Sequence, residues 1–178
     1  YKQYDGIRAQ IKKVLDPATL RYIVIPHFEA DECGGMDRFL AEAPGAKLVC
    51  SDVGFKINLS GWNAPEPLSV WDNDTLDLGR HRLRFLMTPH VHHWDSMMVF
   101  EETEGMLFPA DLFIQPGDQP PVSTEDLSGA MIQLYRMVGI MPSEDAVRRL
   151  LDRLDRLPIR HVNPMHGASI PAAALGPY

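Results

Sequence analysis

Four segments of the sequence carry side chains that bind metals in proteins, and each follows an expected strand. In the first, three such side chains stand at alternate positions, so they converge on one point if the loop stays extended. The second packs three histidines into four residues, and the other two hold one aspartate and one histidine. Strand ends are where an α/β fold gathers its functional groups. In chain order the candidates are His27, Glu29, Asp31, His90, His92, His93, Asp111 and His166.

Imidazoles and carboxylates in similar number form the mixed nitrogen and oxygen environment that first-row metals accept. The two cysteines, Cys33 and Cys50, are not placed to contribute thiolates. Two metal ions would share six ligands, with Asp111 as the candidate bridge and with positions left open for a small molecule. Two divalent ions against three carboxylates leave a charge of about +1, which favours an anion, hydroxide or reduced dioxygen.

Hydrophobic periodicity predicts the elements that must position these residues. The expected strands lie at 20–25, 47–50, 82–87, 96–101, 106–108 and 159–162, with a further short strand within 73–79. The expected helices lie at 5–15, 36–43, 124–139 and 143–154, and an irregular connection lies at 54–67. Residues 114–122 hold three prolines and form a candidate lid over Asp111. Alternating strands and helices around a meander indicate a layered α/β architecture, with the sheet inside.

The composition is that of an ordinary globular protein, and the length predicts one domain over residues 1–178. A formal charge of −7 disfavours nucleic acid and anionic membrane surfaces as partners. The apolar runs are far shorter than the roughly 20 residues that span a bilayer, and no signal peptide is expected. Two cysteines are consistent with a reducing cytoplasm.

Five motifs place the sequence in a known family. They are YIVIPHFEADECGG, DTLDLG, LRFLMTPHVHHWDSMMVF, LFPADLF and NPMHGASI. In order and spacing they resemble the diiron domain of flavodiiron proteins and of stand-alone oxygen-binding diiron proteins, within the metallo-β-lactamase superfamily. The resemblance covers nearly the whole chain and implies an αββα sandwich. The family's N-terminal strands would precede the first expected helix.

The resemblance also implies the metal ligands. One iron would be held by His27, Glu29 and His92, the other by Asp31 and His166, with Asp111 as the bridge. The two iron ions would be joined by an oxo or hydroxo group. Zinc hydrolases of the superfamily carry histidine at the position of Glu29, and a hard carboxylate there favours iron or manganese over zinc.

Three residues depart from the family pattern or lie beside it, and their roles stay open. Glu32 stands where the family commonly has histidine, so it either enters the shell of the second metal or forms a hydrogen bond outside it. His93 and Trp94 stand where reductase members commonly have Trp-Pro. The Ser96 spacing favours His92 over His93 as the ligand, and His93 is expected behind the ligands or at the surface. His90 is expected behind the ligands or in the wall of the pocket.

The resemblance implies that the protein binds dioxygen or nitric oxide, either as a sensor or carrier or as a reductase. No flavodoxin-like phosphate loop is expected, so a reductase would need an external flavoprotein or rubredoxin-like electron donor instead of FMN on this chain. Symmetry weakly favours a homodimer. The alternative is a dinuclear zinc hydrolase that attacks an ester, thioester or phosphoester. A non-enzymatic module on a degenerate scaffold is the weakest reading.

Overall fold

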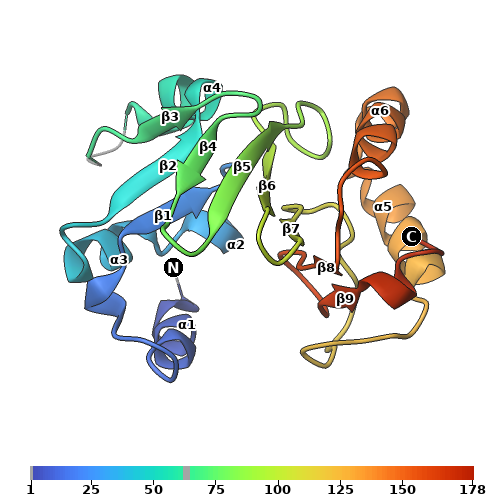
Figure 1. Ribbon diagram of the computed structural model, residues 1–178, viewed down its shortest axis with the longest axis horizontal. Coiled ribbons are helices and arrows are strands. Elements are labelled where there is room, and N and C mark those ends of the chain that lie inside the picture. The colour runs from blue at the N-terminus through green and yellow to red at the C-terminus, as the bar shows by residue number, and fades with distance from the viewer. Residues whose placement is uncertain (1, 62–64) are drawn as a thin grey trace. The chain divides into compact units, whose positions relative to one another are not determined.

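The computed structural model describes residues 2–61 and 65–178, which divide into two units at Val70 (Figure 1). Both units combine a β-sheet with helices, so the predicted α/β class is confirmed. Unit 1 runs to Val70, and unit 2 runs from Trp71 to Tyr178. The prediction of a single domain is not tested by this division and stays a prediction. In the described residues, no helix is long and apolar enough to cross a bilayer.

Unit 1 contains a three-stranded parallel sheet in the order β1-β2-β3. Its strands are β1 (Tyr22–Ile25), β2 (Lys47–Ser51) and β3 (Leu68–Val70). Its helical segments are α1 (Tyr4–Ile11), η1 (Pro17–Thr19), α2 (Ala30–Cys33), α3 (Met36–Glu42), α4 (Asp52–Gly54) and η2 (Phe55–Leu59). The central strand β2 is buried after its first residue. Its Leu48 and Cys50 pack in one apolar cluster with Ile25, Cys33 and Met36.

Two predictions in unit 1 need correction. The first helix ends at Ile11 and not at Leu15, because the next backbone bonds shorten to three-residue spacing and Val14 stays exposed to solvent. The expected irregular connection at 54–67 begins with helical turns, because the Ser51 hydroxyl caps α4 by accepting from the N–H of Gly54. Residues 62–64 of that connection lie outside the described part of the chain.

Unit 2 contains a six-stranded sheet in the order β4-β5-β6-β7-β8-β9. The strands are β4 (Thr75–Asp77), β5 (Arg82–Met87), β6 (Met97–Glu101), β7 (Met106–Phe108), β8 (His161–Val162) and β9 (Ile170–Pro171). Neighbours are antiparallel except β7 and β8, which are parallel and therefore need a long crossover. The crossover contains α5 (Ser128–Val138) and α6 (Glu144–Leu154), and the short helix η3 (Ala172–Ala174) follows β9.

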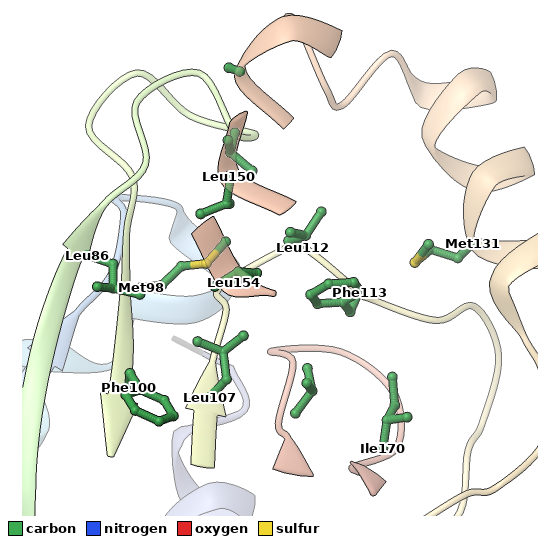
Figure 2. Close-up of a cluster of buried hydrophobic side chains, with 13 residues drawn as sticks. Leu86, Met98, Phe100, Leu107, Leu112, Phe113, Met131, Leu150, Leu154 and Ile170 are labelled. Atoms are coloured by element: carbon green, nitrogen blue, oxygen red, sulfur yellow. The ribbon is translucent and has the colours of Figure 1, made fainter. Parts of the chain in front are cut away.

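The core of unit 2 forms where the two crossover helices cover the sheet (Figure 2). Leu150 and Leu154 of α6 face strand residues that are at most 3% exposed, and Met131 approaches from α5. The strand residues are Leu86, Met98, Phe100 and Leu107. Each fully buried aliphatic side chain contributes about 1.5–3 kcal/mol to folding. The two loops that follow β5 and β7 therefore begin at strands that are packed in this core.

The start of α5 differs from the prediction, since the helix begins at Ser128 and not at Thr124. The acids that indicated a helix start form side-chain turns instead. The Ser123 hydroxyl accepts from the N–H of Glu125, and the Asp126 carboxylate accepts from the N–H of Ser128. The predicted start of α6 is confirmed, because the Ser143 hydroxyl accepts from the N–H of Ala146.

The predicted hairpin between β6 and β7 is confirmed, and Glu101 holds its turn. Its carboxylate accepts from the N–H groups of Thr103 and Glu104, at 2.9 and 2.6 Å. Burial acts to raise the pKa of Glu101, but the hydrogen bonds from Glu104 and Thr103 outweigh it and lower the pKa to about 2. A folded-state pKa below the unfolded value stabilises the protein above pH ~4.3, and this stability is lost as the pH falls towards 2.

Glu101→Gln is therefore expected to lower the free energy of unfolding by about 2–3 kcal/mol at neutral pH, because the neutral amide accepts more weakly from the turn. The difference from the original protein should shrink as the pH falls from about 4 to about 2. Urea denaturation across that range measures both effects. A difference that stays constant with pH would contradict the assignment.

Candidate metal centre

In unit 1, His27 lies directly after β1 and faces two acidic side chains. Its ring is buried, and its Nε2 lies 3.2 Å from Oε2 of Glu32 and 3.6 Å from Oε2 of Glu29. The Glu32 side chain is only 4% exposed, whereas that of Glu29 is 36% exposed. Burying a carboxylate is costly unless a cation or hydrogen bonds compensate it. This group of one imidazole and two carboxylates suits a first-row metal ion.

The loop after His27 does not stay extended, which was the condition for the three side chains of the first motif to converge on one point. Glu29 is extended, but α2 starts at Ala30 and places Asp31 in a helical turn. The Glu29 carbonyl accepts from both the N–H and the thiol of Cys33, and this fixes the turn. Burial raises the pKa of Cys33 to about 11, so the thiol stays protonated at neutral pH. Asp31 is exposed, and its role as a ligand stays a prediction.

In unit 2 the candidate ligands stand on loops with unusual backbone conformations. His90 and His92, after β5, have φ of 66° and 70°. Ala110 and Phe113, on either side of Asp111, have φ of 52° and 70°. Non-glycine residues adopt positive φ at a cost, and they concentrate at functional sites whose surroundings hold them in place.

The carboxylate of Asp111 lies between two imidazoles. Its Oδ2 is 3.4 Å from Nε2 of His92, and its Oδ1 is 4.0 Å from Nε2 of His166. Both separations exceed the usual N–H···O hydrogen-bond distance of about 2.7–3.2 Å. Ligands bound at about 2.1 Å to one ion lie roughly 3–3.5 Å apart, close to the first separation. Asp111 is buried, and each of its oxygens is presented to a different histidine, as a bridging carboxylate requires.

Three further residues fix the positions of these candidate ligands, and sequence analysis did not identify them. They are Ile140, Tyr135 and Gln115. His92 is held through Nδ1, which lies 3.1 Å from the carbonyl oxygen of Ile140, just beyond α5. A carbonyl at that distance fixes the ring and leaves Nε2 to face a metal. Tyr135 of α5 donates its hydroxyl to the carbonyl of Asp111 and accepts from the N–H of Ile114. Burial raises the pKa of Tyr135, so this donor stays protonated.

Gln115 joins the loop of Asp111 to the loop of His166. Its backbone N–H donates to the carbonyl of His166, and its side-chain amide both donates to and accepts from the backbone of Ala168. Gly167 lies between those two residues with a φ of 106°. A Cβ at Gly167 would lie 2.9 Å from the Cβ of Gln115, so the close approach requires glycine.

The segment that was expected as a lid over Asp111 is attached at both ends. Its first residues, Ile114 and Gln115, are buried, and its last pairs with the C-terminal strand region through Val122 and Ser169. No helix or strand forms between these attachment points, as the prolines predict.

The two remaining histidines of the second motif have different surroundings. Nδ1 of His93 pairs closely with Oδ1 of buried Asp95, and its ring lies 5.6 Å from that of Trp94. His90 is exposed to solvent. The structure therefore gives His93 a carboxylate partner within its own loop, and the roles of both histidines at a metal site stay open.

Tyr135→Phe is expected to destabilise the protein by about 1–3 kcal/mol, because it leaves the N–H of buried Ile114 without its acceptor. Tyr178→Phe is the matched control, since that hydroxyl also accepts from a backbone N–H, of Leu127, and donates to a carbonyl, of Glu125. Urea denaturation should show a similar decrease in the free energy of unfolding for both variants. Only Tyr135→Phe should weaken metal retention, and equal retention would show that Tyr135 has no role in holding Asp111.

The comparisons with known proteins agree with this picture. A family model described as ODP family beta lactamase matches residues 1–167. The chain is 30% identical over 174 residues to flavo-diiron protein FprA2 of Clostridium acetobutylicum, covering 92% of this chain and 43% of that protein. It is 26% identical over 172 residues to a nitric oxide reductase of Moorella thermoacetica, again covering 92% and 43%.

A solved structure has the same fold. Rubredoxin oxygen:oxidoreductase of Desulfovibrio gigas superposes with a TM-score of 0.85 at 23% identity, covering 96% of this chain and 44% of that one. These matches define a metallo-β-lactamase-like domain of the flavodiiron type. The chain belongs to the ODP family of beta lactamases, as its motifs predicted. It spans less than half the length of the curated relatives that it matches.

Proposed function

We propose that this chain is a diiron domain that binds dioxygen or nitric oxide. The ligands proposed for two iron ions are His27, Glu29, Asp31, His92, Asp111 and His166. The main support is Asp111, because each oxygen of this buried carboxylate faces a different imidazole within unit 2. The flavodiiron relatives and the nitric oxide reductase supply the reaction class, and Glu29 favours iron or manganese over zinc.

Bound iron would supply the electrons and the open coordination positions that dioxygen or nitric oxide needs. The residues of this chain would hold the iron ions and orient their ligands. Asp111 balances the positive charge, the carbonyl of Ile140 keeps Nε2 of His92 directed at the site, and Gln115 fixes the loop of His166. In unit 1 the buried carboxylate of Glu32 faces His27, so Glu32 as well as Asp31 stays a candidate for a place among the metal ligands.

We further propose that a reductase of this kind receives electrons from a separate flavoprotein or a rubredoxin-like protein. The Desulfovibrio gigas relative is a rubredoxin oxygen:oxidoreductase, which supports a rubredoxin-like donor. A sensor would need no donor, because gas binding itself would be the signal. A homodimer remains an expectation from symmetry.

The metal content of protein purified without added metal tests the proposal, together with an absorption spectrum recorded under argon and then in air. About two iron ions per chain and a new near-ultraviolet to visible band on exposure to oxygen would support it. Reversal of the band under argon favours a sensor, and a band that persists until a reductant is added favours a reductase. Two zinc ions, an unchanged spectrum and turnover of esters would replace the proposal with the hydrolase.

Isosteric variants can decide between Asp31 and Glu32, the two carboxylates of unit 1 whose place among the metal ligands is open. Asp31→Asn and Glu32→Gln each remove one charge and keep the size of the side chain. Iron retention should fall more in the variant whose carboxylate is the ligand, since removing even an outer partner costs roughly 10–100-fold in metal affinity. Equal retention in both variants and in the original chain would remove this pair from the ligand set.

A further inference from the structure

A second polar site lies in unit 2, in a cavity of about 190 Å³ between the end of β5 and one face of α6. This volume is smaller than the roughly 300–1,000 Å³ of pockets that hold drug-sized ligands, so the cavity fits a small ion or molecule. No proposed iron ligand lines it. The lining residues are Met87, Thr88, Pro89, Val91, Ala146, Arg149, Leu150 and Arg153.

Thr88 lines this cavity, and its hydroxyl oxygen is buried. The residue is 4% exposed, and its hydroxyl has no hydrogen-bond partner within residues 2–61 and 65–178. A buried hydroxyl without a partner costs about 1–3 kcal/mol, so such groups normally indicate a bound water, ion or ligand. The backbone of Thr88 is fully used, because its N–H donates to Ser96 and its carbonyl accepts from Val91.

The opposite wall supplies two guanidinium groups, one helical turn apart. Arg149 lines the cavity and has no carboxylate within ion-pairing distance in the described part of the chain. Like charges at i and i+4 repel each other along a helix, so this pair carries a small cost unless an anion lies between its members. The arrangement stands out in a chain with a formal charge of −7.

Arg153 is held in position by two side chains that do not line the cavity. It donates to Oδ1 of Asp72 and to Oδ1 of Asn73, both at 2.9 Å. These bonds use the two terminal nitrogens and fix the plane of the group, so less conformational entropy is lost when a ligand binds. Asp72 offsets one positive charge, which leaves Arg149 as the main source of attraction.

We propose that this cavity binds a small phosphate-type oxyanion, as the free ion or as the phosphoryl group of a small ester. Its oxygens would accept from the guanidinium of Arg149, from the remaining N–H groups of Arg153 and from the hydroxyl of Thr88. Guanidinium groups match phosphate geometry and form strong charge-assisted bonds. Met87, Val91 and Leu150 supply the apolar part of the lining.

The position of Thr88 connects this anion site to the candidate metal loop. Residues 88–96 form the connection between β5 and β6 that carries His92. The N–H of Thr88 joins the two ends of this connection by donating to the carbonyl of Ser96, and the carbonyl of Thr88 accepts from Val91 within it. A bound anion would therefore stabilise the base of that loop. Binding to the folded state alone raises the midpoint of thermal unfolding.

Calorimetric titration with inorganic phosphate tests the proposal, with the full chain at constant ionic strength and sodium chloride as the reference salt. Arg149→Gln should weaken phosphate binding about tenfold or more, because one charge-assisted contact is lost. The control is Arg148→Gln, which removes the same charge from the same helix but from a side chain outside the cavity. Thr88→Val removes the hydroxyl and keeps the shape, so it should also weaken binding and leave the unliganded chain as stable as before or more stable.

The titrations are repeated on metal-free and iron-loaded protein, so that phosphate bound to iron is recognised by its insensitivity to Arg149. Methyl phosphate identifies the source: equal affinity indicates a phosphoryl ester, and clear preference for inorganic phosphate indicates the free ion. Three results would overturn the proposal. They are no saturable binding, which would mean that only water occupies the cavity, equal loss in the Arg148 and Arg149 variants, or unchanged affinity in Thr88→Val, which would mean that phosphate binds elsewhere.

Discussion

Asp111→Asn is expected to remove both iron ions from the purified protein. The carboxylate lies between His92 and His166 with one oxygen facing each, so it is the one side chain of unit 2 that would contact both metals. Asparagine keeps the size of the side chain but lacks the charge that offsets two cations. The loss in affinity should exceed the roughly 10–100-fold that removal of an outer partner costs.

Iron content and the oxygen-dependent spectrum measure this effect, and urea denaturation shows that the variant folds. Glu101→Gln is the control, because it also neutralises a buried carboxylate of unit 2 but one that holds a turn of the β6–β7 hairpin. The control should lose stability and keep its iron. An Asp111→Asn chain that kept two iron ions would contradict the role of this carboxylate as the bridge.

Gly167→Ala is expected to destabilise the protein by about 2–5 kcal/mol. A positive φ costs a non-glycine residue about 1–3 kcal/mol, and the new Cβ would also meet the Gln115 side chain at 2.9 Å. Relief of this overlap requires Gln115 to move, which would break its bonds to Ala168. The neighbouring His166 should then lose its fixed position, so iron retention should fall together with stability.

Gly79→Ala separates the two contributions. Gly79 has a similar φ of 94°, but a Cβ there meets no atom within 4 Å in the described structure. This control should lose only about 1–2 kcal/mol, for the backbone strain alone, and should retain iron. Equal losses in the two variants, measured by urea denaturation, would show that the contact between Gly167 and Gln115 is unimportant.

Local patterns predicted most of the elements because their residues also satisfy the tertiary packing. The strand at Met97–Glu101 is buried along its whole length, and the capped helix at Glu144–Leu154 presents a leucine face to the core. The two-residue strands His161–Val162 and Ile170–Pro171 are different. They exist through pairing with distant partners, so a short window of sequence carries little signal for the first and none for the second.

The candidate ligands could be predicted from the sequence, because their side-chain types identify them. The groups that position them could not be predicted, because those contacts depend on how the backbone folds. Imidazole and carboxylate groups in register identified His92, Asp111 and His166 as candidates. The groups that hold them are a carbonyl of Ile140, a hydroxyl 24 residues from Asp111 and an amide 53 residues from Ala168, and none has a local pattern. Residue spacing also did not predict the change from extended chain to helix at Ala30. This change turns Glu32 towards His27.

The link between Gln115 and Ala168 has a consequence for biosynthesis. A nascent chain that has emerged only as far as α6 already contains His92 and Asp111, but the amide of Gln115 has no Ala168 to bond and β8 has not yet paired with β7. Non-local pairing of this kind is slow, since a long loop must close first. The candidate ligands of unit 2 therefore reach their final positions only after residue 168 has left the ribosome, and the proposed binding of iron would follow that event.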